Sequence, residues 1–395
     1  MKAAIDRIDV FVTDLPVRVE RVFSSGRYDT GPSRTQLGKP VLLRISADGV
    51  VGHGHIRPIT PGHFVPDTTF SMVAALTEIY APVLLGRSIF DIEAIHHALD
   101  LRLPGNPATR AVLDLALHDA VGRALDTPVY NLLGGLCQPL IPLEWSVSLA
   151  DDVGVIVAEA QRAVLEFGMR VLCIKAADRR GWRQDVHNFA AVRRAVGPEI
   201  QIGMDPNTGW TLPDAIQAMY ALRDYDLGYI EQPVARRDLA GLAEIRRIAR
   251  GVPVMADESI FTLDDARALV QARAVDAFCI KLYKVGGLTA ARKIAAVAEA
   301  GNVLLNGGGL AVQSQLEAAA AAHFYASVPA HRMMGAGEFV FGLNTTAPDP
   351  IVPPGSFVVK DGCVEVPHGP GLGIVPDEAM LARHTLRHET VKRAA

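Results

Sequence analysis

Five charged residues recur in the second half of the chain at nearly regular intervals: Lys175, Asp205, Glu231, Asp257 and Lys281. Each ends a short strand-like run, and neighbours are 24 to 30 residues apart, about one strand plus one helix. One acidic residue at a strand end is usually a helix cap or a surface ion pair, but five in register favour a functional site. Three converging carboxylates offer the oxygen ligands that Mg²⁺ prefers, with a lysine on either side.

This set of residues suits the removal of a proton from the carbon next to a carboxylate. The conjugate base is an enediolate with charge on two oxygens, and a divalent cation stabilises that charge as it develops. A lysine must be neutral to act as the base, so a nearby cation or burial has to lower its pKa. A second lysine on the other face can return a proton or stay protonated. We therefore predict a small-molecule carboxylate as the substrate.

Eight strand-like runs position these residues, and most of the middle ones are separated by one helix's worth of sequence. This alternation predicts parallel βα units that close into a (β/α)8 TIM-type barrel, or a modified (β/α)7β barrel, with the charged residues on its catalytic face. The predicted strands are Leu143–Ser148, Val171–Lys175, Ile200–Asp205, Tyr229–Glu231, Val252–Asp257, Ala277–Lys281, Val303–Asn306 and Met333–Phe339.

The first 125 residues have a different pattern. Strand-like runs joined in part by a polar link (24–39) predict a small antiparallel sheet, followed by three helices. The runs are Ile5–Thr13, Val41–Ser46 and Val50–His53, and the helices Ser71–Tyr80, Ile89–Leu101 and Thr109–Arg123. We expect an α+β capping domain over 1–125, a barrel over 126–340, and a C-terminal segment, 341–395, that packs back on the cap and includes a hairpin around Phe357–Val366.

Composition and charge narrow the class of protein. The chain has 395 residues, 49 % of them hydrophobic, and a net charge of −4, which argues against a nucleic-acid or membrane-surface partner. The four cysteines (137, 173, 279 and 363) form no closely spaced metal or redox pair. The first residues are too charged for a secretion signal, so we expect a cytoplasmic protein.

Several motifs resemble those of the enolase superfamily, and within it the muconate-lactonizing enzyme subgroup of mandelate racemase-like proteins. They are Cys-Ile-Lys (173–175), Met-Asp-Pro-Asn-Thr-Gly-Trp (204–210), Tyr-Ile-Glu-Gln-Pro (229–233), Met-Ala-Asp-Glu-Ser (255–259), Ile-Lys-Leu-Tyr-Lys-Val-Gly-Gly-Leu (280–288), Asn-Leu-Leu-Gly-Gly (131–135) and Val-Pro-His-Gly-Pro-Gly-Leu-Gly (366–373). The resemblance covers essentially the whole chain, and it implies a capped barrel and a homo-oligomer.

The resemblance also implies roles for individual residues. Asp205, Glu231 and Asp257 would bind one Mg²⁺, for which Mn²⁺ can substitute. Lys175 would be the base on one face of the substrate, and Lys281 the acid or base on the other. Residues that orient these groups would be Asn207, Glu258 and Lys284.

Two departures from the subgroup stand out. Its usual Lys-x-Lys at the second strand is here Cys173-Ile174-Lys175, so Lys175 must rely on the metal ion and on burial to lower its pKa. Cys173 either fills an apolar gap or marks a non-catalytic relative. The seventh strand ends in Asn306 and three glycines, where the subgroup often has a Glu-Ser stretch; this run could bind a substrate anion or be a plain loop.

Candidate substrate-binding residues lie in loops of the cap and at the last strands: Tyr28, Arg57, Asn306 and Glu338. Glu338 could bind a cationic substrate nitrogen or form a structural ion pair. The loop 53–67 holds His53, His55 and His63, but no spacing of carboxylates or cysteines completes a metal site there.

The expected reaction is a 1,1-proton transfer by a racemase or epimerase, because lysines on both faces suit it. Cycloisomerisation of the muconate type comes next, and dehydration of an acid sugar or hydroxy acid third. Two rivals remain: a non-catalytic relative, and an aldolase with Lys281 as a Schiff-base lysine, which the three carboxylates disfavour.

Overall fold

Eight parallel strands form a nearly closed barrel in the computed structural model, which describes residues 3–14, 20–24, 26–29, 38–58, 65–309, 314–339, 343, 345 and 348–393. Strands at the two ends of the sheet approach each other through a bridge between Leu143 and Gly337. The barrel architecture and all eight strands agree with the prediction. The strands are β7 (Glu144–Val147), β8 (Val171–Lys175), β9 (Gln201–Asp205), β10 (Tyr229–Glu231), β11 (Val254–Ala256), β12 (Ala277–Ile280), β13 (Leu304–Gly307) and β14 (Met333–Gly337).

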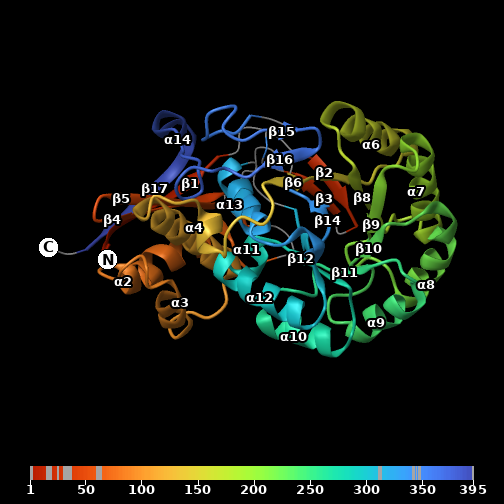
Figure 1. Ribbon diagram of the computed structural model, residues 1–395, viewed down its shortest axis with the longest axis horizontal. Helices are drawn as coiled ribbons and strands as arrows, with labels where there is room; N and C mark the ends of the chain where they lie inside the picture. The colour runs from red at the N-terminus through yellow and green to blue at the C-terminus, as the bar shows by residue number, and fades with distance from the viewer. Residues whose placement is uncertain are drawn as a thin grey trace.

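Helices connect these strands and surround the barrel (Figure 1). They are α6 (Val153–Phe167), α7 (Trp182–Val196), α8 (Leu212–Ala221), η2 (Leu222–Tyr225), α9 (Leu239–Ile248), α10 (Leu263–Gln271), α11 (Leu282–Val285), α12 (Leu288–Ala300), α13 (Gln315–Ala326) and η3 (Ala330–Arg332). Several helices begin at a side chain that accepts a hydrogen bond from the first turn, as Asp152, Thr211 and Thr262 do. These caps explain why short polar loops suffice between strand and helix.

The cap consists of an antiparallel sheet and several helices. It lies on the opposite side of the molecule from α6–α9 (Figure 1). The sheet order is β17-β1-β4-β5, so the last strand of the chain pairs with the first, and Phe11 lies opposite His388. Its elements are β1 (Ile5–Thr13), β4 (Val41–Ala47), β5 (Val50–Ile56), α1 (Thr69–Ala74), η1 (Ala75–Tyr80), α2 (Ala81–Leu84), α3 (Ile92–Asp100), α4 (Pro107–Ala124), α5 (Val129–Leu132), α14 (Glu378–His384) and β17 (Thr385–Lys392). The domain boundaries given above stay a prediction.

Helix α4 joins the cap to the barrel and is buried along almost its whole length. Its Asp114 accepts hydrogen bonds from the backbone N–H and the hydroxyl of Thr289 on α12, at 3.0 and 2.6 Å. On the cap side, the helix lies directly against Gly52 and Gly54 of β5. A Cβ atom at Gly54 would lie 2.1 Å from the carbonyl oxygen of Val112 on α4. Glycine is therefore required for this close approach.

Gly54→Ala is expected to destabilise the protein, because the contacted atom belongs to helix backbone and cannot move aside. Forcing a methyl group into packed surroundings costs about 1–3 kcal/mol. Chemical denaturation monitored by circular dichroism measures this cost. An unchanged free energy of unfolding would show that α4 does not pack this closely on β5.

Two small sheets complete the fold. The segment predicted as a polar link (24–39) contains a strand, β3 (Gly26–Asp29), which pairs with β2 (Glu20–Phe23), so that prediction was wrong for 26–29. The hairpin predicted around 357–366 is present as β15 (Val359–Lys360) and β16 (Cys363–Glu365), and β16 pairs with β6 (Leu140–Pro142) beside the barrel.

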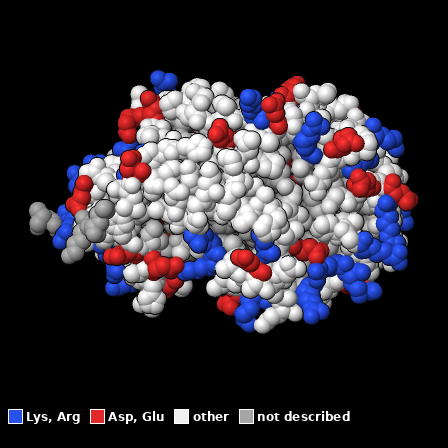
Figure 2. All heavy atoms as spheres, viewed as in Figure 1, with Lys and Arg blue, Asp and Glu red and all other residues white. Residues whose placement is uncertain are grey.

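Charged side chains of both signs alternate along the edges of the face in Figure 2, and the middle of this face is largely uncharged.

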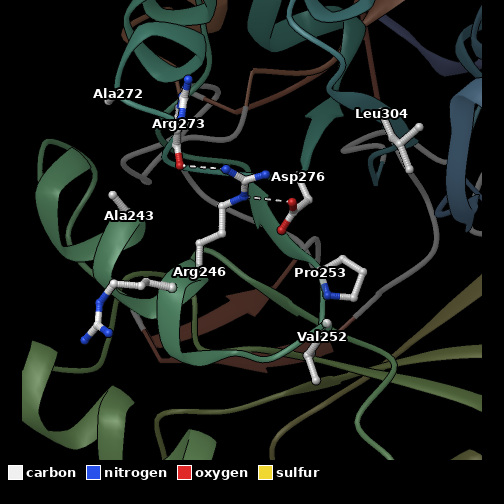
Figure 3. A pocket seen from close by; sticks show the side chains of 10 residues that line it. Ala243, Arg246, Val252, Pro253, Ala272, Arg273, Asp276 and Leu304 are labelled. Atoms are coloured by element: carbon white, nitrogen blue, oxygen red, sulfur yellow. Dashed lines mark hydrogen bonds and ion pairs between the residues drawn. The ribbon is translucent and has the colours of Figure 1, made fainter.

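A cavity of about 650 Å³ lies at the amino ends of β11–β13 (Figure 3). Arg246 crosses it, donating to Asp276 Oδ1 at 2.8 Å and to the carbonyl of Arg273 at 3.0 Å. Barrel enzymes carry their chemistry at the opposite end, so we assign this ion pair a structural role. No helix among the described ranges is long and apolar enough to cross a membrane.

Candidate active site

The carboxyl ends of the middle barrel strands bring the five charged residues together. Lys175, Asp205 and Glu231 are the last residues of β8, β9 and β10, while Asp257 and Lys281 directly follow β11 and β12. All five side chains are buried, each with at most 5 % of its surface exposed. Such complete burial of charge is costly unless the groups pair with one another or with an ion.

Each lysine is paired with a different aspartate. The Nζ atom of Lys175 donates to Asp205 Oδ2 at 2.6 Å, and that of Lys281 donates to Asp257 Oδ2 at 2.5 Å. Three strands separate β8 from β12 in the barrel, so the lysines approach from different sides. Glu231, on the middle strand, exerts its charge on both.

The residues expected to orient the site surround it. Lys284 is fully buried, and its ammonium group donates to Oδ1 and the carbonyl of Asp257 at 2.5 and 2.6 Å. The amide nitrogen of Asn207 donates to Asp205 Oδ2 at 2.8 Å and to Glu258 Oε1 at 3.3 Å. These contacts hold the carboxylates of Asp205, Asp257 and Glu258 in place, and the orienting role of the three residues stays a prediction.

The carboxyl groups differ in the direction of their pKa shifts. Burial raises the pKa of Glu231 well above its usual range, and the charge of Asp205 adds to the effect. Burial also raises the pKa of Asp205, although Lys175 opposes it. For Asp257 burial acts in the same sense, but Lys281 and Lys284 outweigh it and hold the pKa below its usual range. The three carboxyl groups are therefore not equally easy to ionise: burial dominates at Glu231 and Asp205, and the lysines dominate at Asp257.

Both lysines have raised pKa values in this arrangement. Burial alone would lower the pKa of Lys175, but the charges of Asp205 and Glu338 outweigh burial and raise it. The same balance, with Asp257 as the main partner, raises the pKa of Lys281. A lysine can act as a base here only when the carboxylates direct part of their charge to another cation.

The site fits a divalent cation. Glu231 Oε1 and Asn207 Oδ1 are buried oxygen atoms without a hydrogen-bond partner among the described residues. Ligand atoms of Glu231 and Asp205, and of Glu231 and Asp257, lie within 4.8 Å of each other in groups that each include a cysteine. Oxygen ligands of this kind suit Mg²⁺, and Asp205, Glu231 and Asp257 would hold it.

Sequence reasoning missed a second buried layer beneath these charges. Glu144 of β7 lies inside the barrel, where the hydroxyl of Tyr229 donates to its Oε2 atom at 2.7 Å. Cys279 is a second buried thiol beside Glu231, on the opposite side from Cys173. The tripeptide Cys-Ile-Lys of 173–175 occurs again at 279–281, and this repeat was the sequence signal that could have identified Cys279.

Replacing Glu144 with glutamine is expected to remove a pH dependence of stability. Burial and the charge of Glu338 raise the pKa of Glu144 to about 8. The folded state then holds a proton that the unfolded state loses, so stability falls as pH rises from the unfolded pKa toward 8, by at most about 1.4 kcal/mol per pH unit. Unfolding measured across this range tests the slope, with Glu166→Gln on the exposed face of α6 as the control. An equal slope in wild type and Glu144→Gln would contradict this pKa.

The cap reaches the mouth of the barrel near this site. The hydroxyl of Ser24, beside β2, donates to the carbonyl of Asn207 at 3.2 Å, and the N–H of Leu149 donates to the carbonyl of Val22 at 3.1 Å. A cavity of about 690 Å³ between cap and barrel is lined by Pro66 and Arg110 on one side and by Lys284 on the other. This cavity therefore extends to a residue that contacts Asp257.

The predicted substrate-binding residues have different surroundings. Glu338 is buried, with Oε1 3.8 Å from the Lys175 ammonium nitrogen, and Asn306 donates to carbonyls of β14 at 3.1 and 3.3 Å. Arg57 donates to the carbonyl of Gly38 at 2.7 Å. Tyr28 lies on β3, but its side chain is outside the described part of the chain. Their roles in substrate binding stay predictions.

The sequence suggested a loop over 53–67, but the structure places His53 and His55 in a strand. His53 and His55 belong to β5 and are buried in the cap. His55 Nε2 lies 3.1 Å from the hydroxyl of Thr13, and burial lowers the pKa of His55 to about 3. His63 lies outside the described residues.

A capped (β/α)8 barrel with acidic residues at successive strand ends and a lysine on each flank defines a class of enzymes that act on carbon acids. The chain belongs to the mandelate racemase / muconate lactonizing enzyme family of the enolase superfamily. Residues 30–134 match the family's N-terminal domain, and residues 155–380 match the enolase C-terminal domain-like model.

Proteins of assigned activity are similar over most of the chain. A hydrophobic dipeptide epimerase of Enterococcus faecalis (strain ATCC 700802 / V583) is 33 % identical, covering 83 % of this chain and 88 % of that protein. An L-Ala-D/L-Glu epimerase of Bacillus subtilis (strain 168) is 32 % identical over 88 % of this chain and 93 % of that protein. The crystal structure of muconate lactonizing enzyme from Pseudomonas fluorescens with muconolactone has a TM-score of 0.87 and 27 % identity, over 98 % and 100 % of the two chains.

Proposed function

We propose that this protein is a Mg²⁺-dependent epimerase or racemase that moves the α-proton of a small carboxylate. The observation that carries the proposal is the pair of buried lysines, Lys175 and Lys281, on β8 and β12, on either side of Glu231. A base on each side of one carbon can remove a proton from one face and deliver a proton to the other. This is the requirement for a 1,1-proton transfer.

The contacts of these residues support a role for each of them in the proposed reaction. Asp205, Glu231 and Asp257 would hold the cation, which would supply positive charge to stabilise the substrate carboxylate as the proton leaves. Asp205 and Asp257 would then share their charge between the ion and the lysines, which would weaken their pairing with each ammonium group and lower the lysine pKa. Lys175 and Lys281 exchange roles as base and acid according to the configuration of the substrate.

Two features support an amino-acid derivative as the substrate class. Two similar proteins described above are named hydrophobic dipeptide epimerase and L-Ala-D/L-Glu epimerase, which supports a proton transfer next to a carboxylate in an amino-acid derivative. Glu338 offers a buried carboxylate near Lys175, where it could also bind a cationic or N–H group of the substrate. We therefore expect a dipeptide or an N-acylamino acid.

Cycloisomerisation is the second candidate, supported by the likeness to muconate lactonizing enzyme over nearly the whole chain. In that reaction Lys175 would protonate the enolate formed on ring closure, and Lys281 would not need to exchange protons. The two candidates therefore differ in whether both lysines transfer protons.

Proton NMR in D₂O with Mg²⁺ tests the proposal. The full chain is incubated with dipeptides, N-acylamino acids and cis,cis-muconate. Loss of an α-proton signal together with the appearance of the epimer would support the proposal. Lactone formation from muconate without α-proton exchange of any amino-acid derivative would favour the second candidate and reject the first.

A further inference from the structure

The two strands that carry the lysines share the tripeptide Cys-Ile-Lys, at 173–175 and 279–281. Alternate residues of a strand face the same side, so each cysteine faces the barrel interior one layer below its lysine. Both thiols are buried in one interior cluster with Tyr229 and Met255. The proton transfer proposed above uses the lysines and gives neither thiol a role in the reaction.

Glu231 lies close enough to each thiol for its carboxylate and that thiol to bind the same ion. Cys173 Sγ is 3.8 Å from Glu231 Oε2, and ligand atoms of Cys173, Asp205 and Glu231 all lie within 4.8 Å of one another. Cys279 forms an equivalent group with Glu231 and Asp257. Glu231 Oε1, on a side chain 2 % exposed, has no hydrogen-bond partner in the described part of the chain. An ion with bonds of about 2.0–2.3 Å can contact three such atoms together.

The two thiols differ in the positive charge beside them. Asp257, in the group with Cys279, accepts from the ammonium groups of both Lys281 and Lys284, each at 2.5 Å. Asp205, in the group with Cys173, accepts from the single ammonium group of Lys175, at 2.6 Å. A cation is repelled less on the side that has one ammonium group, which favours the site at Cys173.

We propose that Cys173, Asp205 and Glu231 form a mixed sulfur–oxygen site for a thiophilic divalent cation such as Zn²⁺, Cd²⁺ or Co²⁺. The inference rests on the proposed function only for the position of the Mg²⁺ site. The sulfur–oxygen site shares the carboxylates of Asp205 and Glu231 with that Mg²⁺ site. The metal–sulfur bond forms as the thiol proton leaves to solvent, because a divalent ion deprotonates a thiol that coordinates it. Thiolate ligands select soft ions, while carboxylates alone suit Mg²⁺. The two kinds of ion therefore compete for one site.

Titration of the metal-free full chain with Co²⁺ tests the proposal, since cobalt bound to sulfur has a charge-transfer absorption band that cobalt bound to oxygen alone lacks. We expect this band to saturate at one equivalent and to disappear when excess Mg²⁺ displaces the cobalt. Cys173→Ser is expected to lose the band and to weaken Zn²⁺ binding by about tenfold or more. Cys279→Ser is the matched control, and it should keep the band. Thermal unfolding by circular dichroism shows that both variants are folded.

Two results would overturn the assignment: bound Co²⁺ without a sulfur band in the wild type, or a band that persists in Cys173→Ser. A band lost only in Cys279→Ser would move the site to the other thiol and also contradict it. These outcomes are separate from the proposed function. α-Proton exchange with Mg²⁺ and no cobalt–sulfur band would reject the thiol site alone, whereas a band without exchange of any substrate would reject the epimerase proposal alone.

Discussion

Lys175→Ala is expected to stop proton removal from one configuration of the substrate, and Lys281→Ala to stop it from the other. Each lysine lies on its own side of the carboxylate cluster and is paired with its own aspartate, so neither can replace the other. Loss of a general base typically lowers the rate by about 10²- to 10⁴-fold. In both variants overall epimerisation should fall by this amount, since it requires both residues.

The measurement is deuterium incorporation from D₂O into each enantiomer or epimer supplied separately. Lys293→Ala, which removes a half-exposed lysine paired with Glu93 on the outside of the protein, is the matched control and should exchange at the wild-type rate. If a single variant abolished exchange from both configurations while the other left both intact, a two-base mechanism would be excluded.

Glu231→Gln is expected to change stability in opposite directions with and without Mg²⁺. Because burial raises the pKa of Glu231, the folded wild type without metal is penalised for this charge above the unfolded pKa, and the penalty grows as pH rises. Removing the charge should therefore stabilise the metal-free protein by on the order of 1 kcal/mol at neutral pH. The same change removes a metal ligand and should weaken Mg²⁺ binding by about 100-fold.

Thermal unfolding at neutral pH, with and without Mg²⁺, measures both effects. At a Mg²⁺ concentration of 100 times the dissociation constant the wild type should gain about 2.7 kcal/mol, and the variant almost none. Glu144→Gln, which also removes a buried barrel carboxyl group but one that is not a predicted ligand, is the control and should keep its response to Mg²⁺. Equal stabilisation of wild type and Glu231→Gln by Mg²⁺ would show that Glu231 is not a ligand.

The positions of the five charged residues could be predicted because barrel topology converts a sequence period into a place in space. Parallel strands end at one face, so Lys175, Asp205 and Glu231 had to lie near one another once the strands were recognised. Their pairing into two lysine–aspartate contacts could not be predicted, since it depends on side-chain rotamers and on the exact strand register.

Other features could not be predicted because their local sequence is typical of a different kind of structure. Glu144 stands in a short apolar strand, and only the register of β7 against its neighbours shows that its side chain enters the barrel. His53 ends a strand-like run, and His55 follows it shortly before several prolines, which suggested a loop, but β5 continues to Ile56 because its pairing with β4 extends that far. The strand Gly26–Asp29 has too few apolar residues to be distinguished from a polar link.

The pairing of β17 with β1 has a consequence for how the protein is made. Thr385–Lys392 must arrive before β1 can become an inner strand, so the cap sheet is incomplete until the chain as far as Lys392 has left the ribosome. The barrel strands, which pair with near neighbours in sequence, can assemble earlier, contrary to the usual order in which the N-terminal domain folds first. During that interval β1 is an open edge that can pair with another nascent chain. Early release of a chain that stops before Thr385 would leave that edge permanently exposed.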